Sequence, residues 1–474
     1  MHALPQGGNR VFMNETKTAA VHEENPMGYV AINPLLIKLS VPMMISMLVQ
    51  ALYNIVDSVF VSRISEDALS ALSLAFPVQN LLISFAVGTA VGVNALLSKS
   101  LGEKNYEQVN RSAQNGLFLS CCTFVPFLLF GLFGTRAFFY AQTTNAAIRQ
   151  YGVDYLGIVC VLSIACFLQC MLEKLLVATG RSFYAMITQL AGALTNIILD
   201  PIMIFGLFGF PRMEAAGAAI ATVCGQFVGC AMGIYFNHRV NQEVHMNFRG
   251  FKPHGRTIAN IYNVAAPSIA MQAIGSIMTL CMNTILMAFS STAVAVFGAY
   301  FKLQSFVFMP IFGLNNGLVP IVSFNYGARK PERIMKAIKL AWLYATGIML
   351  LGLLAAQLAP NVLLNMFDAS EDMMGLGVKA LRIISPHFLL AGIGVVNSGV
   401  FQALGQGIYS LLVSLIRQLV VLIPAAFLLS LSGDVNMVWW AFLIAESVAL
   451  ATSIFFMTRA NKKIIQPLYQ HPEA

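Results

Sequence analysis

The chain has 474 residues, of which 58% are hydrophobic and only 10% are charged, and its mean hydropathy is +0.73. In soluble domains about a quarter of the residues are charged, so a chain this apolar has too few polar side chains to cover its surface in water. Apolar runs of spanning length, about 20 residues, recur along the sequence without alternating polar and apolar positions. These features exclude a transmembrane barrel and predict an all-α polytopic membrane protein.

The expected elements begin after a polar segment. Residues 1–33 lack an apolar core and are therefore expected to be a cytosolic tail rather than a signal peptide. In "NPLLIKL", Asn33 is the expected N-cap of the first helix and Pro34 its first helical residue. Helix ends and charges then predict twelve spans. They are placed at 35–62, 68–98, 111–134, 150–178, 183–207, 214–237, 258–289, 293–325, 336–358, 377–404, 408–431 and 436–458.

The basic residues orient these spans. The loops on one side hold Lys99, Lys104, Arg111, Arg181, Arg239, Arg249, Lys252, Arg256, Arg329, Lys330, Arg333, Lys336, Lys339, Arg459, Lys462 and Lys463. The opposite loops hold few, chiefly Arg63, Arg136, Arg149 and Arg212. The positive-inside rule therefore predicts that both termini are cytosolic. This sidedness and contact with anionic lipids explain the net charge of +8, so no nucleic-acid partner is expected.

An internal repeat divides the chain into halves. The stretch "GTAVGVNALLSKSLGEKNYEQV" at 88–109 matches "GLNNGLVPIVSFNYGARKPERI" at 313–334 with an offset of 225 residues. The same offset aligns Gly88 with Gly313, Gly92 with Gly317, Ser98 with Ser323, Gly102 with Gly327, Pro42 with Pro267, Gln79 with Gln304, Gly180 with Gly405 and Tyr184 with Tyr409. Six helices per half predict parallel repeats related by an axis along the membrane normal. The expected parts are the tail 1–33, an amino-terminal lobe 34–237, a cytosolic linker 238–257, a carboxy-terminal lobe 258–459 and a cytosolic tail 460–474.

Two bundles related in this way indicate a secondary transporter whose substrate binds near mid-membrane between the halves. No phosphate loop, metalloprotease motif or nucleophile elbow occurs in the sequence, so we expect neither an enzyme nor a cofactor. Work would then come from an ion gradient, in which one charge moved through 100 mV is worth about 2.3 kcal/mol.

Polar side chains interrupt two of the apolar spans. In "TNIILDPIMIFG", Asn196 and Asp200 are four residues apart and share a helix face. In "QALYNIVDSV" one face carries Gln50, Tyr53, Asn54 and Asp57, with Pro42 earlier in the same span. A charge at the centre of a span costs about 2.5–3.5 kcal/mol, so two carboxylates point to a shared proton or cation. The alternative is that each carboxylate merely hydrogen-bonds a neighbouring helix.

These residues resemble a known family. The motif "NxxxDPxxIFG", a proline followed by "YNxxD", the glycine-rich "GTAVGVNALLSKSLGEKN" and "EAAGAAIATVCGQ" are similar to those of the multidrug and toxic compound extrusion (MATE) family, in particular its bacterial drug exporters. The resemblance covers about residues 33–460. It implies a V-shaped pair of six-helix lobes in the bacterial plasma membrane that export drugs in exchange for Na⁺ or H⁺.

The resemblance also implies functional residues. The cation site of the family's amino-terminal lobe corresponds to Asp57, Asn196, Asp200 and Thr222, whose oxygens suit either Na⁺ or a shared proton. Tyr53 and Tyr155 correspond to tyrosines that face the substrate cavity, which Gln50 and Asn54 are also expected to line, and Pro42 corresponds to a proline at which the first helix bends.

The carboxy-terminal lobe departs from the family pattern. The residues offset by 225 from Asp57 and Asp200 are Met282 and Ala425, so ion coupling is expected in the amino-terminal lobe alone.

Glu173 and Lys174, near the cytosolic end of the fourth span, are expected to snorkel or to pair locally.

Four ionisable groups of this lobe or its cavity have open roles, namely Lys302, Arg417, Glu446 and His387. Lys302 could repel a cationic drug, whereas Glu446 could form a structural pair with Arg417 or Lys302. His387 could be a pH switch or a buried histidine with satisfied hydrogen bonds.

The substrate is indicated only by class. The 24 methionines and 34 phenylalanines offer adaptable apolar surface, and acidic groups near aromatic rings favour lipophilic cations. We expect a monomer whose partners are small-molecule drugs or metabolites and membrane lipids. Two alternatives remain, a lipid-linked oligosaccharide or peptidoglycan-precursor flippase of the related superfamily and a non-transporting scaffold or sensor.

Overall fold

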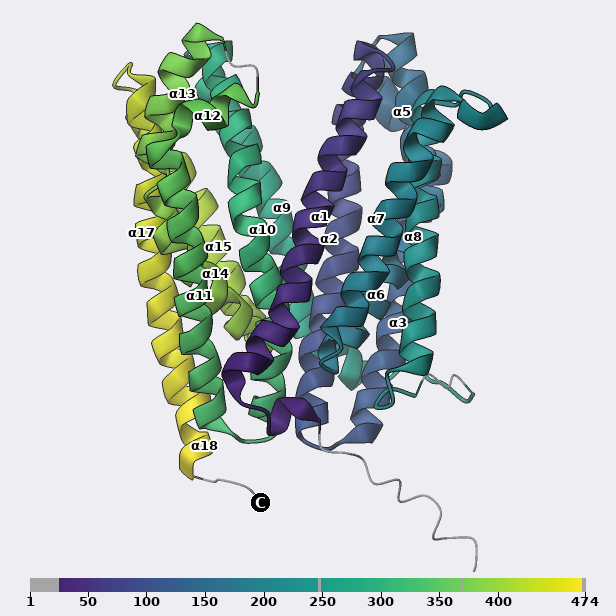
Figure 1. Ribbon diagram of the computed structural model, residues 1–474, viewed down its shortest axis with the longest axis vertical. Coiled ribbons are helices and arrows are strands. Elements are labelled where there is room, and N and C mark those ends of the chain that lie inside the picture. Colours follow the sequence, from purple (N-terminus) through teal and green to yellow (C-terminus); the bar gives the residue numbers. More distant parts are fainter. Residues whose placement is uncertain (1–24, 246–248, 368–369, 471–474) are drawn as a thin grey trace, which may run out of the picture.

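The computed structural model describes residues 25–245, 249–367 and 370–470, which form helices, turns and no strand (Figure 1). The amino-terminal lobe contains α1 (Ile32–Ser62), α2 (Glu66–Gly102), α3 (Tyr106–Leu129), α4 (Thr135–Gln142), α5 (Ala146–Val161), α6 (Ile164–Ala178), α7 (Ser182–Phe205) and α8 (Glu214–Arg239). The carboxy-terminal lobe contains α9 (Gly255–Met287), α10 (Ser291–Gly327), α11 (Pro331–Leu358), α12 (Pro360–Asn365), α13 (Glu371–Ile384), α14 (His387–Ala403), α15 (Gly407–Leu415), α16 (Ile423–Ser430), α17 (Val435–Ala460) and α18 (Gln466–Gln470). Short 3₁₀ segments are η1 (Pro26–Gly28) and η3 (Leu207–Gly209), and π-helical segments are η2 (Phe130–Gly134), η4 (Ile416–Leu422) and η5 (Asn461–Ile465).

The spans agree with the expected topology. In the described part of the chain, ten helices are long and apolar enough to cross a bilayer, and two bent helix pairs bring the number to as many as twelve. Most helix ends lie within a few residues of the predicted ones. The third span is longer than predicted, because α3 continues through η2 and α4 as far as Gln142.

Two spans predicted as single helices, 150–178 and 377–404, are broken. The α5–α6 pair bends by 47° and the α13–α14 pair by 52°. The second break has a clear cause, because Pro386 has no N–H to donate to the carbonyl of Arg382. The side chain of Gln357 donates to that carbonyl instead, at 2.8 Å, and to the hydroxyl of Ser385 at 2.9 Å. The helix can therefore bend there without leaving the carbonyl of Arg382 unpaired.

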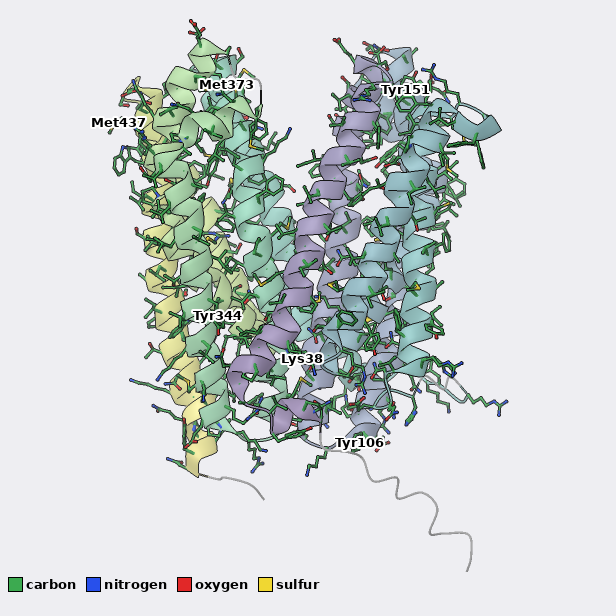
Figure 2. The ribbon with its side chains drawn as sticks, in the orientation of Figure 1. Lys38, Tyr106, Tyr151, Tyr344, Met373 and Met437 are labelled. Carbon is green, nitrogen blue, oxygen red and sulfur yellow. The ribbon has the colours of Figure 1, made fainter. Side chains whose placement is uncertain are left out.

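The two lobes form a V (Figure 1). They pack together at one end, where α1 lies against α10 and α2 against α9, and diverge toward the other end. The start of α1 and the last helix, α18, both lie at the closed end. Figure 2 places Lys38 and Tyr106 near this closed end and Tyr151 and Met373 near the open end.

The repeat is visible in the hydrogen bonds as well as in the sequence. The Ser98 hydroxyl donates to the carbonyl of Ala178 at 2.9 Å, and the Ser323 hydroxyl donates to the carbonyl of Ala403 at 2.8 Å. Both members of each pair are offset by 225 residues. The same offset relates the N-caps Ser65 and Ser290 and the left-handed residues Gly180 and Gly405. The lobes are therefore two copies of one helical design, which confirms the predicted parallel repeat.

The outer surface of the molecule is apolar. Large hydrophobic side chains are exposed on helices of both lobes, including Phe133, Ile234, Leu280, Leu351, Phe427 and Phe455. Water-soluble monomers rarely expose this much contiguous apolar surface, whereas a helix in contact with lipid tails requires it.

Candidate functional site

A cavity of about 740 Å³ lies between the two lobes. The amino-terminal lobe contributes its wall from α1, α2, α6, α7 and α8, and the carboxy-terminal lobe from α9, α10, α14, α15, η4 and α17. Its lining is largely apolar, with methionine and phenylalanine side chains such as Met47, Met271, Phe308 and Phe442. The volume suits a drug-sized molecule.

The two predicted carboxylates meet behind the amino-terminal wall of this cavity. Asp57 on α1 and Asp200 on α7 do not line the cavity, and Asp200 is 0% exposed. The two side chains are neighbours in space. Asn196 and Thr222 do line the cavity, and Asn196 contacts both Asp200 and Thr222. The four residues that the resemblance assigns to a cation site therefore come together in space.

Asn196 connects the cavity to the carboxylates. With its amide oriented to satisfy its neighbours, its nitrogen donates to Oδ2 of Asp200 at 3.2 Å. Its oxygen then accepts from the hydroxyl of Thr222 at 3.3 Å and from the backbone N–H of Thr222 at 3.1 Å. Close packing of α7 on α8 makes this possible, because a Cβ on Gly225 would lie 2.5 Å from the carbonyl oxygen of Gly192.

The two carboxylates have no basic partner among the described residues. Oδ1 of Asp57 is buried and has no hydrogen-bond partner. Among the ion pairs of the described residues, none joins a lysine or arginine to Asp57 or Asp200. The described residues also contain no group of three or more His, Cys, Asp and Glu side chains placed to hold a metal ion. A cation here would therefore be held by two carboxylates and neutral oxygens, a donor set suited to Na⁺ or to a proton.

The other predicted cavity residues are divided. Gln50, Tyr53 and Asn54 line the cavity, and Gln50 accepts a hydrogen bond from Gln189 at 2.9 Å. Tyr155 does not line it. Its hydroxyl is buried behind the wall and donates to Oε1 of Gln79, a lining residue, at 3.4 Å.

Two alternatives were expected for Glu173 and Lys174, snorkelling or local pairing. Snorkelling is wrong, because both residues line the cavity and Lys174 is buried, whereas Glu173 does have a local partner. The Lys174 ammonium donates to Oδ1 of Asn316 at 2.5 Å, which joins α6 of one lobe to α10 of the other. Glu173 accepts from Gln169 at 2.9 Å. The spacing of four between Gln169 and Glu173 is the signal that could have placed them on one inward face.

The carboxy-terminal wall carries a second charged group. Arg417 and Glu446 form an ion pair at 3.6 Å, and both line the cavity. Glu446 therefore has one of its two expected structural partners. The other, Lys302, lies away from the cavity lining with its ammonium 5.9 Å from the centre of the Phe367 ring.

His387 has the environment of a satisfied buried histidine. Its Nδ1 lies 2.7 Å from the carbonyl oxygen of Ile384, and its Nε2 lies 3.4 Å from the hydroxyl of Tyr300. Aromatic rings, including those of Phe308 and Phe388, surround it.

Comparisons with known proteins agree with this architecture. The sequence profile of the MatE family matches residues 42–202 and 267–428, one match in each lobe. The Multidrug export protein MepA of Staphylococcus haemolyticus is 27% identical over 426 residues, which cover 90% of this chain and 93% of that protein. The protein of the same name from Staphylococcus saprophyticus is 26% identical over 417 residues, covering 88% and 91%.

Solved structures give the same result. The structure titled "Crystal structure of MATE in complex with MaL6" superposes with a TM-score of 0.88 at 25% identity, covering 94% of this chain and 99% of that one. An "Outward-facing conformation of a multidrug resistance MATE family transporter" superposes with a TM-score of 0.88 at 24% identity and equal coverage, a likeness of fold. The double profile match and these likenesses place the chain in the MatE family of multidrug efflux transporters, which are membrane proteins and not enzymes.

Proposed function

We propose that this chain is a secondary active antiporter that exports lipophilic, cationic drugs or toxic metabolites in exchange for Na⁺ or H⁺. The carrying observation is the pair of carboxylates formed by half-buried Asp57 and buried Asp200, which has no basic ion-pair partner in the described chain and lies directly behind the cavity wall. Such a pair is costly within a membrane unless a cation or proton neutralises it. The name of the staphylococcal relatives, Multidrug export protein, supports drug export.

The arrangement suggests how the ion and the substrate are coupled. Asn196 and Thr222 separate the carboxylates from the cavity, so an ion that enters from the cavity passes these two polar side chains. Binding of the ion changes the charge behind the wall that a cationic substrate faces. Substrate and ion are then favoured in different states of the same lobe, which is the requirement for antiport.

The test removes each charge while keeping the shape of the side chain. Asp57→Asn and Asp200→Asn should still insert, because loss of an intramembrane charge lowers the insertion cost by up to about 2.5–3.5 kcal/mol. We expect both variants to retain the melting temperature of the parent in detergent, to bind a lipophilic cation, and to lose its export against a gradient. Efflux of ethidium from drug-sensitive bacteria and the melting temperature are measured side by side.

Asp154→Asn is the matched control, because Asp154 is a half-buried acid of α5 that accepts hydrogen bonds from Gln150 and lies outside the cavity lining. It should export normally. If the carboxylates had a structural role instead, each substitution would destabilise the protein, since an orphaned buried partner costs about 3–5 kcal/mol. Unstable variants, or stable variants that still pump, would therefore refute the coupling role.

We also propose a bacterial plasma-membrane location with the closed end of the V and both termini in the cytosol. The expectation rests on the Lys and Arg residues of the loops. In a chain whose native cysteines have been replaced, a cysteine at Asp434, which precedes α17, should react with an impermeant thiol reagent added outside intact cells. Cysteines at Arg249 and Lys330 should not react. Labelling at Arg249 would reverse the topology. The protein is expected to work as a monomer.

A further inference from the structure

We propose that the carboxy-terminal wall of the cavity is a subsite for an anionic group, in which Arg417 binds the carboxylate of an amphipathic substrate. The inference rests on the proposed function, because it assumes that the cavity binds the exported molecule. It names the residue that would select, among aromatic amphiphiles, those that carry a carboxylate.

Arg417 is incompletely paired. The arginine lines the cavity, and 29% of its side chain is exposed. Its ion pair with Oε1 of Glu446 is 3.6 Å long, which exceeds the usual hydrogen-bond distance. A guanidinium has five N–H donors in a planar fork that matches a carboxylate. A buried ion pair with only a structural role is expected to be close and shielded on both sides, whereas this pair is long and its arginine is partly exposed.

The helix that carries Arg417 has an irregular geometry. Arg417 lies in η4, a π-helical segment between α15 and α16. The equivalent part of the other lobe, within α7, is α-helical throughout. π-helical turns are rare and frequently occur at functional sites, because the extra residue redirects the side chains around it.

The two lobes differ at the positions of this pair. The repeat aligns Arg417 with Gly192, and α8 and α17, which both have 26 residues and start at Glu214 and Val435, align Glu446 with Gly225. In that lobe small residues allow α7 to approach α8 closely, as the contact of Gly192 with Gly225 demonstrates. The carboxy-terminal lobe has instead placed a charged pair at the equivalent positions, in a wall that faces substrate. Each lobe therefore carries polar groups on its fifth and sixth spans. In the amino-terminal lobe these groups include the acid Asp200, whereas in the carboxy-terminal lobe the more exposed group is the base Arg417.

The cavity surface around Arg417 is largely aromatic. Phe308, Phe312 and Phe442 line the same side of the cavity, and Gln418 follows Arg417 as a further polar lining residue. Glu446 is only 5% exposed, so the guanidinium is the more accessible member of the pair. An aromatic ring system can lie against the phenylalanines while its carboxylate takes the free donors of the guanidinium.

The test uses rhodamine B, which carries a carboxylate, and its ethyl ester, which has the same rings without that charge. Binding of each dye to the purified full-length protein in lipid nanodiscs is measured by fluorescence anisotropy. Arg417→Gln should raise the ratio of the dissociation constants, acid over ester, by about tenfold, the loss expected for a charge-assisted hydrogen bond. Lys302→Gln, which removes a positive charge of α10 outside the lining, should leave the ratio at the parental value.

Glu446→Gln separates the subsite from a structural pair. Removing the competing carboxylate should preserve or tighten binding of the acid dye, because the whole guanidinium becomes available. A structural pair requires the reverse, with Arg417→Gln and Glu446→Gln both lowering the melting temperature and weakening both dyes equally. That result, or an unchanged ratio in Arg417→Gln, would overturn the proposal. Binding is measured without an ion gradient, so failure of coupling at Asp57 and Asp200 would leave this outcome unaffected.

Discussion

Asn196 is the side chain that links the cavity to the carboxylates of the candidate site. It is the one residue of the predicted set that both lines the cavity and touches Asp200 directly, and its second end is held by Thr222. A polar side chain in this position orients a carboxylate oxygen and gives an ion its first contact on entry. The expectation is therefore a role in ion affinity rather than in substrate affinity.

Asn196→Ala should lower the affinity for the coupling ion more than it lowers the stability of the fold. The substitution leaves Oδ2 of Asp200 without a donor, and an unsatisfied buried group costs about 1–3 kcal/mol. We expect the ion concentration or pH at half-maximal efflux to shift severalfold, with a modest fall in melting temperature. Asn397→Ala is the control. Asn397 is buried in α14 and bonded to Ser453 and Trp342, so its loss should lower the melting temperature without changing the ion dependence.

Some of the site could be predicted from single residues and some could not. The spacing of four between Asn196 and Asp200 fixes a shared face, and the cost of intramembrane charge indicates a joint role for Asp57 and Asp200. The contact of Lys174 with Asn316 joins helices of different lobes, 142 positions apart, so no local pattern could reveal it.

At the scale of elements, helix length was predictable and helix breaks were less so. Apolar runs fix the number and the approximate ends of the spans, because the bilayer fixes their length. The break before α14 depends on Gln357 of α11, whose amide replaces the hydrogen bond that Pro386 cannot make. Prolines elsewhere do not break their helices, since α1 runs unbroken through Pro42 and α10 through Pro310. A bend at Pro42 during transport therefore stays a prediction.

The seam between the lobes depends on glycines that the repeat places symmetrically. A Cβ on Gly317 of α10 would lie 2.7 Å from the Cα and N of Ser40 on α1. Its counterpart Gly92 on α2 meets the carbonyl oxygen of Ile261 on α9 in the same way. Because the obstacles are backbone atoms, neither helix can yield by changing a rotamer.

Gly317→Ala should therefore force the seam apart. Overpacking costs about 1–3 kcal/mol, so we expect a lower melting temperature and slower efflux at normal expression. Gly298→Ala is the matched control, because Gly298 lies in the same helix and a Cβ there would have no neighbour within 4 Å. That variant should be neutral or stabilised by up to about 1 kcal/mol, as alanine is the better helix former. Equal melting temperatures for the two variants would show that the seam is not tightly packed.

At the scale of the whole molecule, the V is held at its closed end by contacts between lobes. α1 packs on α10 and α2 on α9, helix pairs that the offset of 225 makes equivalent. Polar contacts add to this seam. The hydroxyl of Tyr344 donates to Asn33, and Lys174 donates to Asn316. The parallel repeat was predictable from the sequence. These contacts were not, because they depend on how the two lobes pack against each other, which the repeat does not specify.

The segment before α1, residues 25–31, lies at this closed end and forms hydrogen bonds with both lobes. On the amino-lobe side, the Asn25 amide donates to the carbonyl of Thr179 at 3.3 Å and to Glu243 at 3.0 Å. On the carboxy-lobe side, Arg333 donates to the carbonyl oxygens of Met27 at 3.0 Å and Val30 at 2.7 Å. These bonds must break before the closed end can open, because the lobes they join would move apart.

Loosening this segment should make the closed end open more often. Arg333→Gln removes the guanidinium contacts to Met27 and Val30 but leaves the helices that line the cavity intact. We expect a cysteine at Asn316, which lines the cavity beside Lys174, to react severalfold faster with a thiol reagent applied from the closed end of the protein in inverted vesicles. Arg239→Gln is the control, because Arg239 is an exposed residue at the end of α8 and should leave the rate at its parental value. If Arg333→Gln labels no faster than Arg239→Gln, the segment before α1 does not hold the lobes together.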